Sequence, residues 1–464
     1  MEDQSTGIEA DAAFGPAPQT AANMITFRIP QRLAVNIKND LVRTHSFAFE
    51  RVGFIYTKLN LSHNGKNAII LATDYEAVAD EDYIDDPHVG ARINSTAIRK
   101  VMQRTLTTGE GAFHVHVHDH DGTPGLSHTD MKEIRPMMQS VRNAAPQTAH
   151  GLLVLSRDAA LAETLLPKAS QFSPVPKVVM VGFTMGLLAC DDSLPGRVER
   201  FSRQTFLGPV AELSIVNYRV GIVGLGGGGS HIAQQLAHVG FLNYALFDND
   251  TVEASNLNRL IGGTHADVKK RTAKIEVGAR LIKSVNPVAQ IEKIASRWQD
   301  ASDSLRACDI IFGCVDSYAE RRDLEIVTRR YLIPYVDIGL DVHQSGNEPP
   351  RMAGQVILSM PGELCMSCMG FLNKTNLERE AERYGVAGPR PQVVWANGVL
   401  ASNAVGVAID LITDWTQSLR SPVYLSYDSN TCVVQPHKRL QYVKDMKCPH
   451  FPLSNLGDPT FNRL

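Results

Sequence analysis

The chain has 464 residues, of which 44% are hydrophobic and 20% charged, and its formal net charge is −3. This length favours two domains, each able to bury a core. The small net charge gives no indication of a nucleic acid or an acidic membrane surface as a partner, and no apolar run approaches the roughly 20 residues of a membrane-spanning helix. Seven cysteines, an odd number in a long chain, favour a reducing cytoplasm over a disulfide framework.

Composition and turn signals divide the chain into five predicted segments. The N-terminal segment is rich in Ala, Gly and Pro, has no apolar core and is predicted to be a flexible arm. Between the two predicted domains lies a polar stretch, Asp-Asp-Ser-Leu-Pro-Gly-Arg, that is typical of a linker. The predicted segments are an arm over residues 1–24, a first domain over 25–190, a linker over 191–199, a second domain over 200–446 and a C-terminal tail over 447–464.

The second half alternates compact apolar runs with helical segments. Apolar runs at residues 219–224, 244–248, 309–313 and 335–339 are separated by stretches of helical character, among them residues 230–239 and 270–284. Alternating buried strands and helices predict an α/β fold with a doubly wound parallel sheet of the Rossmann-like type. The first half mixes short strands with helices, one of them predicted over residues 95–107, and is predicted to be a separate α/β domain.

A glycine-rich loop follows the first predicted strand of the second half. The sequence Gly-Leu-Gly-Gly-Gly-Gly-Ser over residues 224–230 lies between that strand and a helix, where glycines let the backbone approach a phosphate and the helix offers free N–H groups. Asp248 ends the next strand, at the spacing where an acidic side chain binds ribose hydroxyls. The predicted phosphate cradle includes Gly224, Gly226, Gly227 and Gly229.

A polar and cationic cluster follows the predicted ribose site. The binding of NAD alone does not require such a cluster. Asn256 and Arg259 lie just beyond the predicted ribose site, Lys274 lies on a helix, and Asp316 follows the strand that begins at Ile310. The cationic side chains are predicted to hold a triphosphate, and the aspartate to hold Mg²⁺. These groups stabilise charge as pyrophosphate leaves.

This ordered set of motifs resembles the ThiF/MoeB/HesA family, which is related to ubiquitin-activating enzymes. The resemblance implies that the second domain uses ATP to adenylate the C-terminal glycine of a ubiquitin-like protein. It assigns phosphate binding to Asn256, Arg259 and Lys274, and Mg²⁺ binding and catalysis to Asp316. The segment Arg-Phe-Ser-Arg-Gln over residues 200–204 is similar to one that reaches into a partner subunit's ATP site, so Arg203 is expected to act in trans within a homodimer.

Two departures from the family pattern concern cysteines. The chain has no cysteine between Cys368 and Cys432, where ubiquitin-activating enzymes carry their nucleophile, so a thioester would have to use Cys314, Cys432 or Cys190. The family often holds a structural Zn²⁺ with two CxxC pairs, whereas this chain has one. A Cys₃His set could bind Zn²⁺, and two free thiols are the alternative. The set would be Cys365, Cys368, Cys448 and His450.

The first half contains a run of alternating histidines. Alternate residues of a strand point to one face, so the histidines of His-Val-His-Val-His-Asp-His over residues 114–120 are predicted to line up. Two histidines and one carboxylate form the three-ligand set of a catalytic zinc, which lowers the pKa of a bound water to about 7. Glu50 is the candidate base that takes the proton of this water.

This pattern resembles the JAB/JAMM (MPN) metalloprotease family, in which a glutamate precedes His-x-His, seven residues and Ser-x-x-Asp. Pairing His116 with His118 leaves eight residues before Ser127, and pairing His118 with His120 leaves six, so both registers stay open, with a slight preference for the first. Asp130 completes the set. By resemblance, Ser127 stabilises the oxyanion, and the first domain is an MPN-type zinc (iso)peptidase.

The two resemblances together predict a bifunctional enzyme that trims and adenylates a ubiquitin-like protein in a bacterial-type conjugation pathway, with a conjugating enzyme as a further partner. A second hypothesis is activation of a sulfur carrier for cofactor or metabolite biosynthesis, with a sulfur donor as partner. A third is a non-catalytic adaptor that binds a ubiquitin-like protein, which the intact Glu50, Lys274 and Asp316 disfavour.

Overall fold

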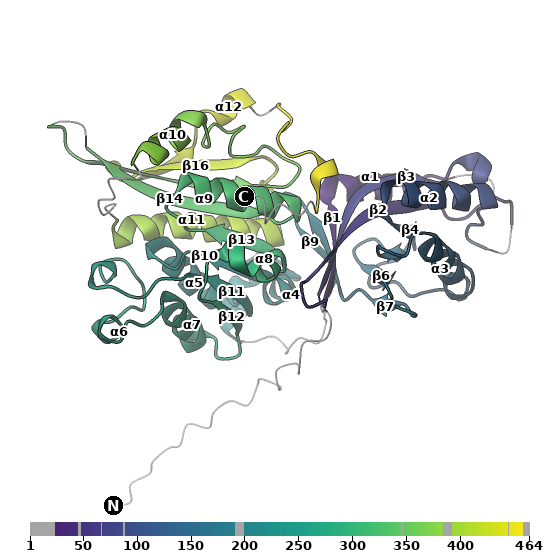
Figure 1. Cartoon of the computed structure of the whole chain (residues 1–464), viewed down its shortest axis with the longest axis horizontal. Helices are drawn as coiled ribbons and strands as arrows, with labels where there is room; N and C mark the ends of the chain where they lie inside the picture. The colour runs from purple at the N-terminus through teal and green to yellow at the C-terminus, as the bar shows by residue number, and fades with distance from the viewer. Residues whose placement is uncertain are drawn as a thin grey trace, which may run out of the picture.

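The computed structural model describes residues 24–44, 48–65, 67–86, 89–190, 199–344, 347–383, 392–443 and 445–457. The predicted arm, except Met24, lies outside these residues, as do residues 191–198 of the predicted linker and residues 458–464 of the predicted tail. Two sheets, each with its own covering helices, lie next to each other and contain the described strands (Figure 1).

The first domain is a mixed sheet with helices packed on it. Its nine strands are ordered β7-β6-β5-β4-β2-β3-β1-β8-β9, with β1 parallel to β3 and β8, and β2 antiparallel to β3 and β4. Its elements are β1 (Ile25–Pro30), α1 (Gln31–Leu41), β2 (Val52–Leu61), β3 (Ala68–Ala77), α2 (Ser95–Thr108), β4 (Gly111–Val117), η2 (Asp130–Ile134), α3 (Arg135–Ala144), β5 (His150–Leu155), β6 (Ala160–Leu165), β7 (Ser173–Pro174), β8 (Lys177–Val181) and β9 (Gly186–Ala189).

The second domain is built on an eight-stranded sheet of order β12-β11-β10-β13-β14-β15-β16-β17. The five strands β12, β11, β10, β13 and β14 are parallel to their neighbours. Strands β15, β16 and β17 extend the sheet in antiparallel pairs. Its elements are η3 (Glu199–Leu207), α4 (Ala211–Asn217), β10 (Arg219–Val223), α5 (Gly227–Val239), β11 (Asn243–Phe247), η4 (Ala254–Asn256), α6 (His265–Lys270), α7 (Lys274–Val285), β12 (Gln290–Ile294), η5 (Trp298–Ala301), α8 (Ser302–Arg306), β13 (Ile310–Gly313), α9 (Tyr318–Arg330), β14 (Tyr335–His343), β15 (Arg351–Ser359), α10 (Lys374–Arg383), α11 (Val394–Thr413), β16 (Val423–Asp428), β17 (Val433–Pro436), α12 (Leu440–Val443) and η6 (Leu453–Asn455).

The order of the parallel strands reverses between β10 and β13. From β10 the chain runs through α5 to β11 on one side, and from β13 it runs through α9 to β14 on the other. Because such crossovers are right-handed, α5 and α9 cover opposite faces of the sheet. In open α/β sheets the carboxyl ends of the strands at this reversal form a ligand crevice.

Helix α11 is the central helix of the second domain. It is the one helix in the described part of the chain that is long and apolar enough to cross a membrane, by length and composition, although 61% of its apolar window is buried. It packs against α5, β14 and β15, which accounts for its apolar composition. No apolar segment of this length was predicted from the sequence, since polar and small residues interrupt the apolar ones of α11.

A buried arginine joins the two domains. The guanidinium of Arg28, on β1, donates to the carbonyl oxygens of Tyr331 at 2.7 Å, Cys308 at 2.8 Å and Arg306 at 3.0 Å. Arg28 as a whole is only 1% exposed. Lys177, on β8, forms an ion pair of 2.5 Å with Asp309. Residues 308 and 309 precede β13, so the first domain is docked at the amino end of the parallel sheet.

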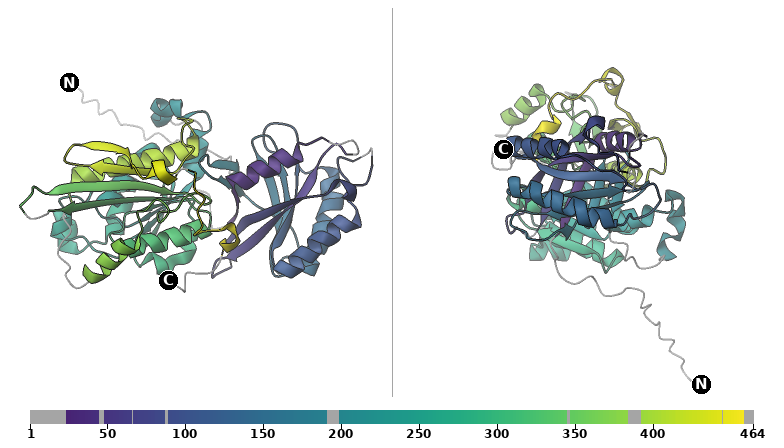
Figure 2. Two further views of the ribbon diagram at one scale, coloured as in Figure 1. Left: turned by 90° about the horizontal axis from the view of Figure 1, so that it is seen from above. Right: turned by 90° about the vertical axis from the view of Figure 1, so that its right-hand side faces the viewer.

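Apolar side chains fill the same interface. Ile69, Leu71, Val179 and Val181 of the first domain belong to one buried cluster with the core of the second. Figure 2 shows the two sheets meeting along β1, β8 and β9 when the molecule is seen from above. A shared core of this kind fixes the two domains relative to each other.

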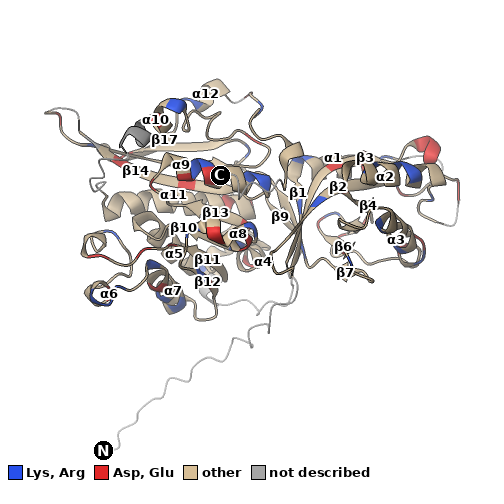
Figure 3. Cartoon of the chain, in the orientation of Figure 1, with Lys and Arg blue, Asp and Glu red and all other residues tan. Residues whose placement is uncertain are grey.

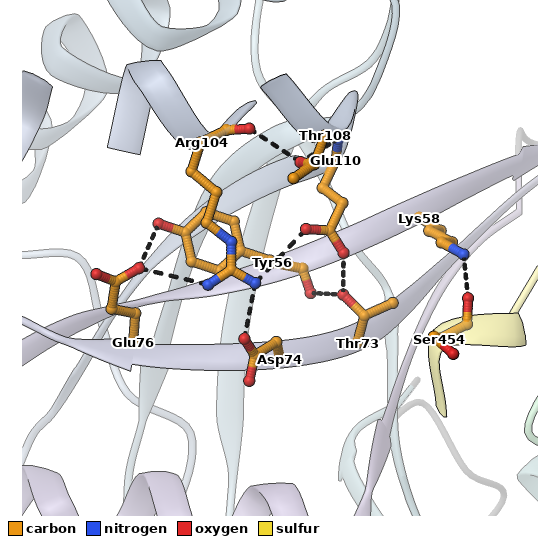
Figure 4. Close-up of polar contacts among 9 residues, drawn as sticks. All are labelled: Tyr56, Lys58, Thr73, Asp74, Glu76, Arg104, Thr108, Glu110 and Ser454. Atoms are coloured by element: carbon orange, nitrogen blue, oxygen red, sulfur yellow. Dashed lines mark hydrogen bonds and ion pairs between the residues drawn. The ribbon is translucent and has the colours of Figure 1, made fainter. Parts of the chain in front are cut away.

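The C-terminal segment returns to the first domain. Lys58 Nζ, on β2, donates to the carbonyl of Ser454 in η6 at 2.7 Å, and the Gly457 amide donates to the carbonyl of Arg330 at 2.8 Å. Figure 4 shows this contact beside a polar group in which Arg104 lies over the ring of Tyr56. Charged residues of both signs are interspersed over both domains in Figure 3, in keeping with the small net charge.

Candidate functional site

A cavity of about 360 Å³ opens at the carboxyl ends of β10, β11 and β13. This volume is in the range of small-molecule sites, about 300–1,000 Å³. The cavity collects most of the residues predicted for nucleotide binding, from separate loops of the sheet edge. They are Gly224, Gly226, Gly227, Asp248, Asn256, Arg259, Lys274 and Asp316.

The glycine loop turns sharply out of β10 and into α5. Gly224 has φ +87°, and a side chain there would lie 2.6 Å from the Cys314 carbonyl. Gly227 begins α5, three residues earlier than the predicted helix, because the last glycines of the loop are already helical. A side chain on Gly227 would lie 2.6 Å from the amide nitrogen of Asn397, so the glycine keeps this part of the cavity open.

Gly229 lies at a close contact between α5 and the glycine loop. A side chain at Gly229 would lie 1.9 Å from the Gly224 carbonyl oxygen. Gly229 lies in the first turn of α5 and does not line the cavity. The missing side chain of Gly229 lets the helix pack on the loop, and its predicted part in the phosphate cradle stays a prediction.

Asp248 follows β11 directly and holds the loop in place. Its carboxylate accepts from the backbone N–H of Leu225 at 2.7 Å and of Asp250 at 2.8 Å. Burial raises the pKa of the Asp248 carboxyl, and the nearby Lys274 ammonium and these two N–H groups oppose the rise. Lys274 Nζ pairs with Asp250 at 2.7 Å. Asp248 thus faces the cavity at the predicted ribose position.

Asn256 and Arg259 lie on the segment after β11, which wraps the mouth of the cavity. The Asn256 side-chain oxygen accepts from the Glu253 N–H at 3.0 Å and caps η4. Arg259 donates to the Ser255 carbonyl at 2.8 Å, and its side chain lies against Gly227. The structure brings Arg259 next to the glycine loop, where a cation can meet a phosphate.

Asp316 lies beyond the end of β13. The strand ends at Gly313, and Asp316 is the third residue after it. The Asp316 carboxylate is exposed to the cavity and accepts from Gln392 Nε2 at 3.3 Å. An exposed carboxylate facing a phosphate cradle fits the oxygen ligands that Mg²⁺ prefers.

Several cavity residues were missed by the sequence analysis. Gln392 and Asn397 come from the region of α11, and Trp298 and Glu320 form a wall in which the Trp298 indole N–H donates to Glu320 at 3.1 Å. Burial raises the pKa of the Glu320 carboxyl. Their distance in sequence from the glycine loop left no local signal, because only the packing of the sheet and helices brings them together.

The first domain holds a second group of titratable side chains. Ligand atoms of Glu50, His116 and His118 all lie within 4.8 Å of one another. His116 Nε2 lies 3.2 Å from His118 Nε2 and 3.3 Å from the Asp130 carboxylate. Two imidazoles and a carboxylate are a zinc ligand set. This geometry favours the register that pairs His116 with His118.

The predicted alignment of four histidines on one strand is wrong in two respects. Strand β4 ends at Val117, so His118 and His120 lie beyond it. His120 Nδ1 faces the Asp121 carbonyl at 2.9 Å, and His120 is absent from the metal-binding groups found among the described residues. His114 is buried against Phe54, and burial lowers the pKa of its imidazole.

Glu50 and Ser127 complete this group. The Glu50 carboxylate packs against Gly90, where a side chain would lie 2.7 Å from it and would displace it. Burial raises the pKa of the Glu50 carboxyl, an effect that His118 opposes. The Asp130 carboxylate accepts from the Ser127 N–H at 2.6 Å, and the Ser127 hydroxyl accepts from the Asp130 N–H at 3.1 Å. This reciprocal pair fixes Asp130 beside His116.

A third group joins the CxxC pair to the C-terminal segment. Ligand atoms of Cys365, Cys368, Cys448 and His450 lie within 4.8 Å of one another, although 80 residues separate the two pairs in sequence. His450 Nδ1 lies 3.3 Å from Cys365 Sγ and 3.4 Å from Cys368 Sγ. Three thiols and an imidazole fit a structural Zn²⁺.

Fold and cavity define an α/β nucleotide-binding domain, and comparison with known proteins identifies its family. Residues 201–449 match the ThiF family model, which covers more than half of the chain. The chain therefore belongs to the ThiF family, as the resemblance predicted.

Curated relatives include the SAMP-activating enzyme E1 of Haloferax volcanii, 28% identical over 37% of this chain and 62% of that protein. Another is the molybdopterin-synthase adenylyltransferase of Escherichia coli, 28% identical over 52% of this chain and 92% of that protein. Among solved structures is E. coli MccB with MccA-N7isoASN, with a TM-score of 0.44 and 22% identity over 52% of this chain and 71% of that one.

Proposed function

We propose that the second domain adenylates the C-terminal carboxylate of a small ubiquitin-like or sulfur-carrier protein, with ATP as co-substrate. The observation that carries this proposal is the convergence of the glycine loop, Asp248, Arg259, Lys274 and Asp316 on one cavity. Relatives named as activating enzymes and adenylyltransferases support the reaction class.

In the proposed reaction a carboxylate oxygen of the carrier attacks the α-phosphorus of ATP. The bond from this phosphorus to the bridging oxygen breaks, and pyrophosphate leaves with its electron pair. Arg259 and Lys274 offset the negative charge that develops on the phosphates, and the N–H groups at the start of α5 hold them in place. Mg²⁺ bound by Asp316 would supply further positive charge.

The cysteines favour the acyl-adenylate as the activated product formed by this chain. Cys314 lines the cavity, but burial raises the pKa of its thiol, so the nucleophilic thiolate is disfavoured. Cys432 is exposed in the turn between β16 and β17. A terminal glycine on the carrier and passage of the acyl group to a conjugating enzyme or a sulfur donor remain parts of this proposal.

A homodimer is the proposed assembly, with Arg203 acting in the partner's cavity. Arg203 lies in η3 and is exposed, and it does not line the nucleotide cavity of its own chain. Phe206 and Trp415 are exposed and contact each other edge to face at 5.4 Å, and Val210 is exposed nearby in sequence. Exposed apolar side chains next to η3 support a protein contact there.

The adenylation proposal is tested by ATP–pyrophosphate exchange with purified full-length protein and candidate carriers that end in glycine. We expect exchange that depends on the carrier, and its loss by at least about 100-fold in Asp316→Ala, since a charge-stabilising group is removed. Asp445→Ala, at an exposed site outside the cavity, is the matched control. ATP binding without exchange for any carrier would contradict the proposal and favour the adaptor hypothesis.

A second proposed function is a zinc-dependent (iso)peptidase in the first domain, because Glu50, His116, His118 and Asp130 converge there. Zinc bound here would lower the pKa of a bound water toward 7. Glu50 would accept the proton of this water and Ser127 would donate to the developing oxyanion. Peptide hydrolysis by zinc-loaded protein, lost in Glu50→Gln, tests this function.

A further inference from the structure

The candidate metal group lies in one wall of a large cavity. This cavity measures about 490 Å³ and is lined by Glu50, His116, His118, Ser127 and Asp130. An extended glycine backbone has no side chains, so a glycine-only peptide tail would leave much of this space unfilled. The cavity is thus larger than the space that the backbone around a scissile peptide bond occupies.

The opposite walls are apolar. The apolar lining residues from the segment before α2, from α2 itself and from η2 with the start of α3 include Ile84, Ala91, Ile93, Ile98, Ile134 and Met137. Four of them, Ala91, Ile93, Ile134 and Met137, pack on a buried cluster that includes Val52, Tyr83 and Met138. Their positions are fixed by the domain core, so the cavity is a preformed feature of the fold.

The charged residues at the rim form one ion-paired group, in which a single guanidinium lies between two carboxylates. Arg92 pairs with Asp86 at 2.6 Å and with Glu133 at 3.2 Å, and both Arg92 and Glu133 line the cavity. A substrate carboxylate would compete with two carboxylates for this guanidinium. A charged substrate side chain that enters the apolar part of the cavity would be costly to desolvate.

We propose that this cavity selects peptides that carry a large aliphatic side chain next to the scissile bond. The proposal rests on the peptidase function proposed above and specifies its substrate class. A leucine-sized side chain in an apolar pocket gains about 10- to 200-fold over a smaller one. The size of the cavity and its apolar lining favour such a side chain over a glycine, and the cost of desolvating a charge against this lining favours it over an acid or a base.

The test measures affinity separately from hydrolysis. Full-length zinc-loaded Glu50→Gln protein is titrated with fluorescent hexapeptides that contain a Gly-Gly pair. One residue, Gly, Ala, Leu, Glu or Lys, is placed either before or after this pair. We expect the leucine peptide to bind at least about tenfold more tightly than the alanine peptide in one of the two positions, and the glutamate and lysine peptides to bind more weakly than the leucine peptide.

A cavity-filling variant provides the specific control. Ala91→Leu in the same background is expected to lower the affinity for the leucine peptide by about tenfold, and to leave the glycine peptide unaffected. Ala77→Leu, at the exposed end of β3 outside the cavity, is expected to keep the preference. Equal affinities for all peptides, or a leucine preference that survives in Ala91→Leu, would overturn the proposal.

Hydrolysis by the unmutated protein then separates the two proposals. A leucine preference in binding without any hydrolysis would reject the peptidase function and retain the cavity assignment. Hydrolysis of every peptide at one rate would reject the cavity assignment and retain the peptidase.

Discussion

Asp267, in the first turn of α6, accepts four hydrogen bonds through its carboxylate. It accepts from the Thr264 N–H at 3.0 Å and hydroxyl at 2.6 Å, and from both terminal nitrogens of Arg280, on α7, at 3.0 and 2.8 Å. These donors favour the ionised form and hold the pKa of the Asp267 carboxyl well below its usual range. One residue thus caps α6 and ties it to α7.

We predict that this residue makes stability depend on pH. Because the pKa of Asp267 is lower in the folded than in the unfolded state, its stabilisation is complete above the unfolded value, about 3.9, and is lost as the pH falls below it. Asp267→Asn should reduce the free energy of unfolding by about 1–2 kcal/mol at pH 7. The difference from the parent should shrink toward pH 3, as measured by urea unfolding. A difference that is constant with pH would contradict this.

At the level of single residues, the sequence predicted the nucleotide cavity better than the metal group. Asp248 could be placed at the nucleotide cavity because it directly follows an apolar run that is recognisable as a strand. The carboxyl ends of parallel strands share one edge of the sheet. Residues such as Asn397 and Trp298 could not, since they reach the cavity only through the packing of α11 and η5. The choice between the two histidine registers depends on where β4 ends. The alternation of histidines in the sequence does not show this end.

Helix α2 illustrates an element that the sequence predicted almost to the residue. A helix was expected over residues 95–107, and α2 spans Ser95–Thr108. Asn94 accepts from the N–H groups of Thr96 and Ala97, and Gly109 ends the helix with φ +72°. Where such caps are missing from the sequence, as at the start of α5, the predicted boundary moved by three residues.

Arg104 connects α2 to the sheet of the first domain (Figure 4). Its guanidinium lies 3.6 Å from the centre of the Tyr56 ring and pairs with Asp74 at 2.7 Å and Glu76 at 3.4 Å. We predict that Arg104→Ala lowers the free energy of unfolding of this domain by about 1–2 kcal/mol, because both the stacking and the charge pairs are lost.

Arg104→Lys should recover only part of this loss, since an ammonium lacks the planar fork. Arg99→Ala, at an exposed position of the same helix, serves as the control. Thermal unfolding of the three variants compares them directly. An equal loss for Arg99→Ala and Arg104→Ala would show that only helix charge matters.

At the scale of the whole molecule, the sequence predicted two domains but gave no sign of how they dock. Arg28 is one cation in an apolar strand, and its three carbonyl partners lie about 280 to 300 residues away. We predict that Arg28→Met costs about 3–5 kcal/mol, because Asp309 and the carbonyls lose their buried partner. Scanning calorimetry of the parent should show one main transition, and the variant should show a separate earlier one.

Arg32→Met is the matched control for this docking. Arg32 also bridges the two domains, through Glu363 at 2.7 Å, but its side chain is 70% exposed. An exposed pair contributes about 1 kcal/mol or less. A single unshifted transition in Arg28→Met would mean that the apolar contacts alone hold the domains together.

The docking at the amino end of the parallel sheet also determines the route that a substrate takes. The nucleotide cavity opens at the carboxyl end of the same strands, and the metal group lies on β2 and β4, beyond β1 and β3 in the order of the first sheet. The body of the second domain lies between the nucleotide cavity and the metal group, so the two sites face separate regions of solvent. Under the two functions proposed above, a carrier protein would have to leave one cavity before it reaches the other, and its free concentration would couple the two steps.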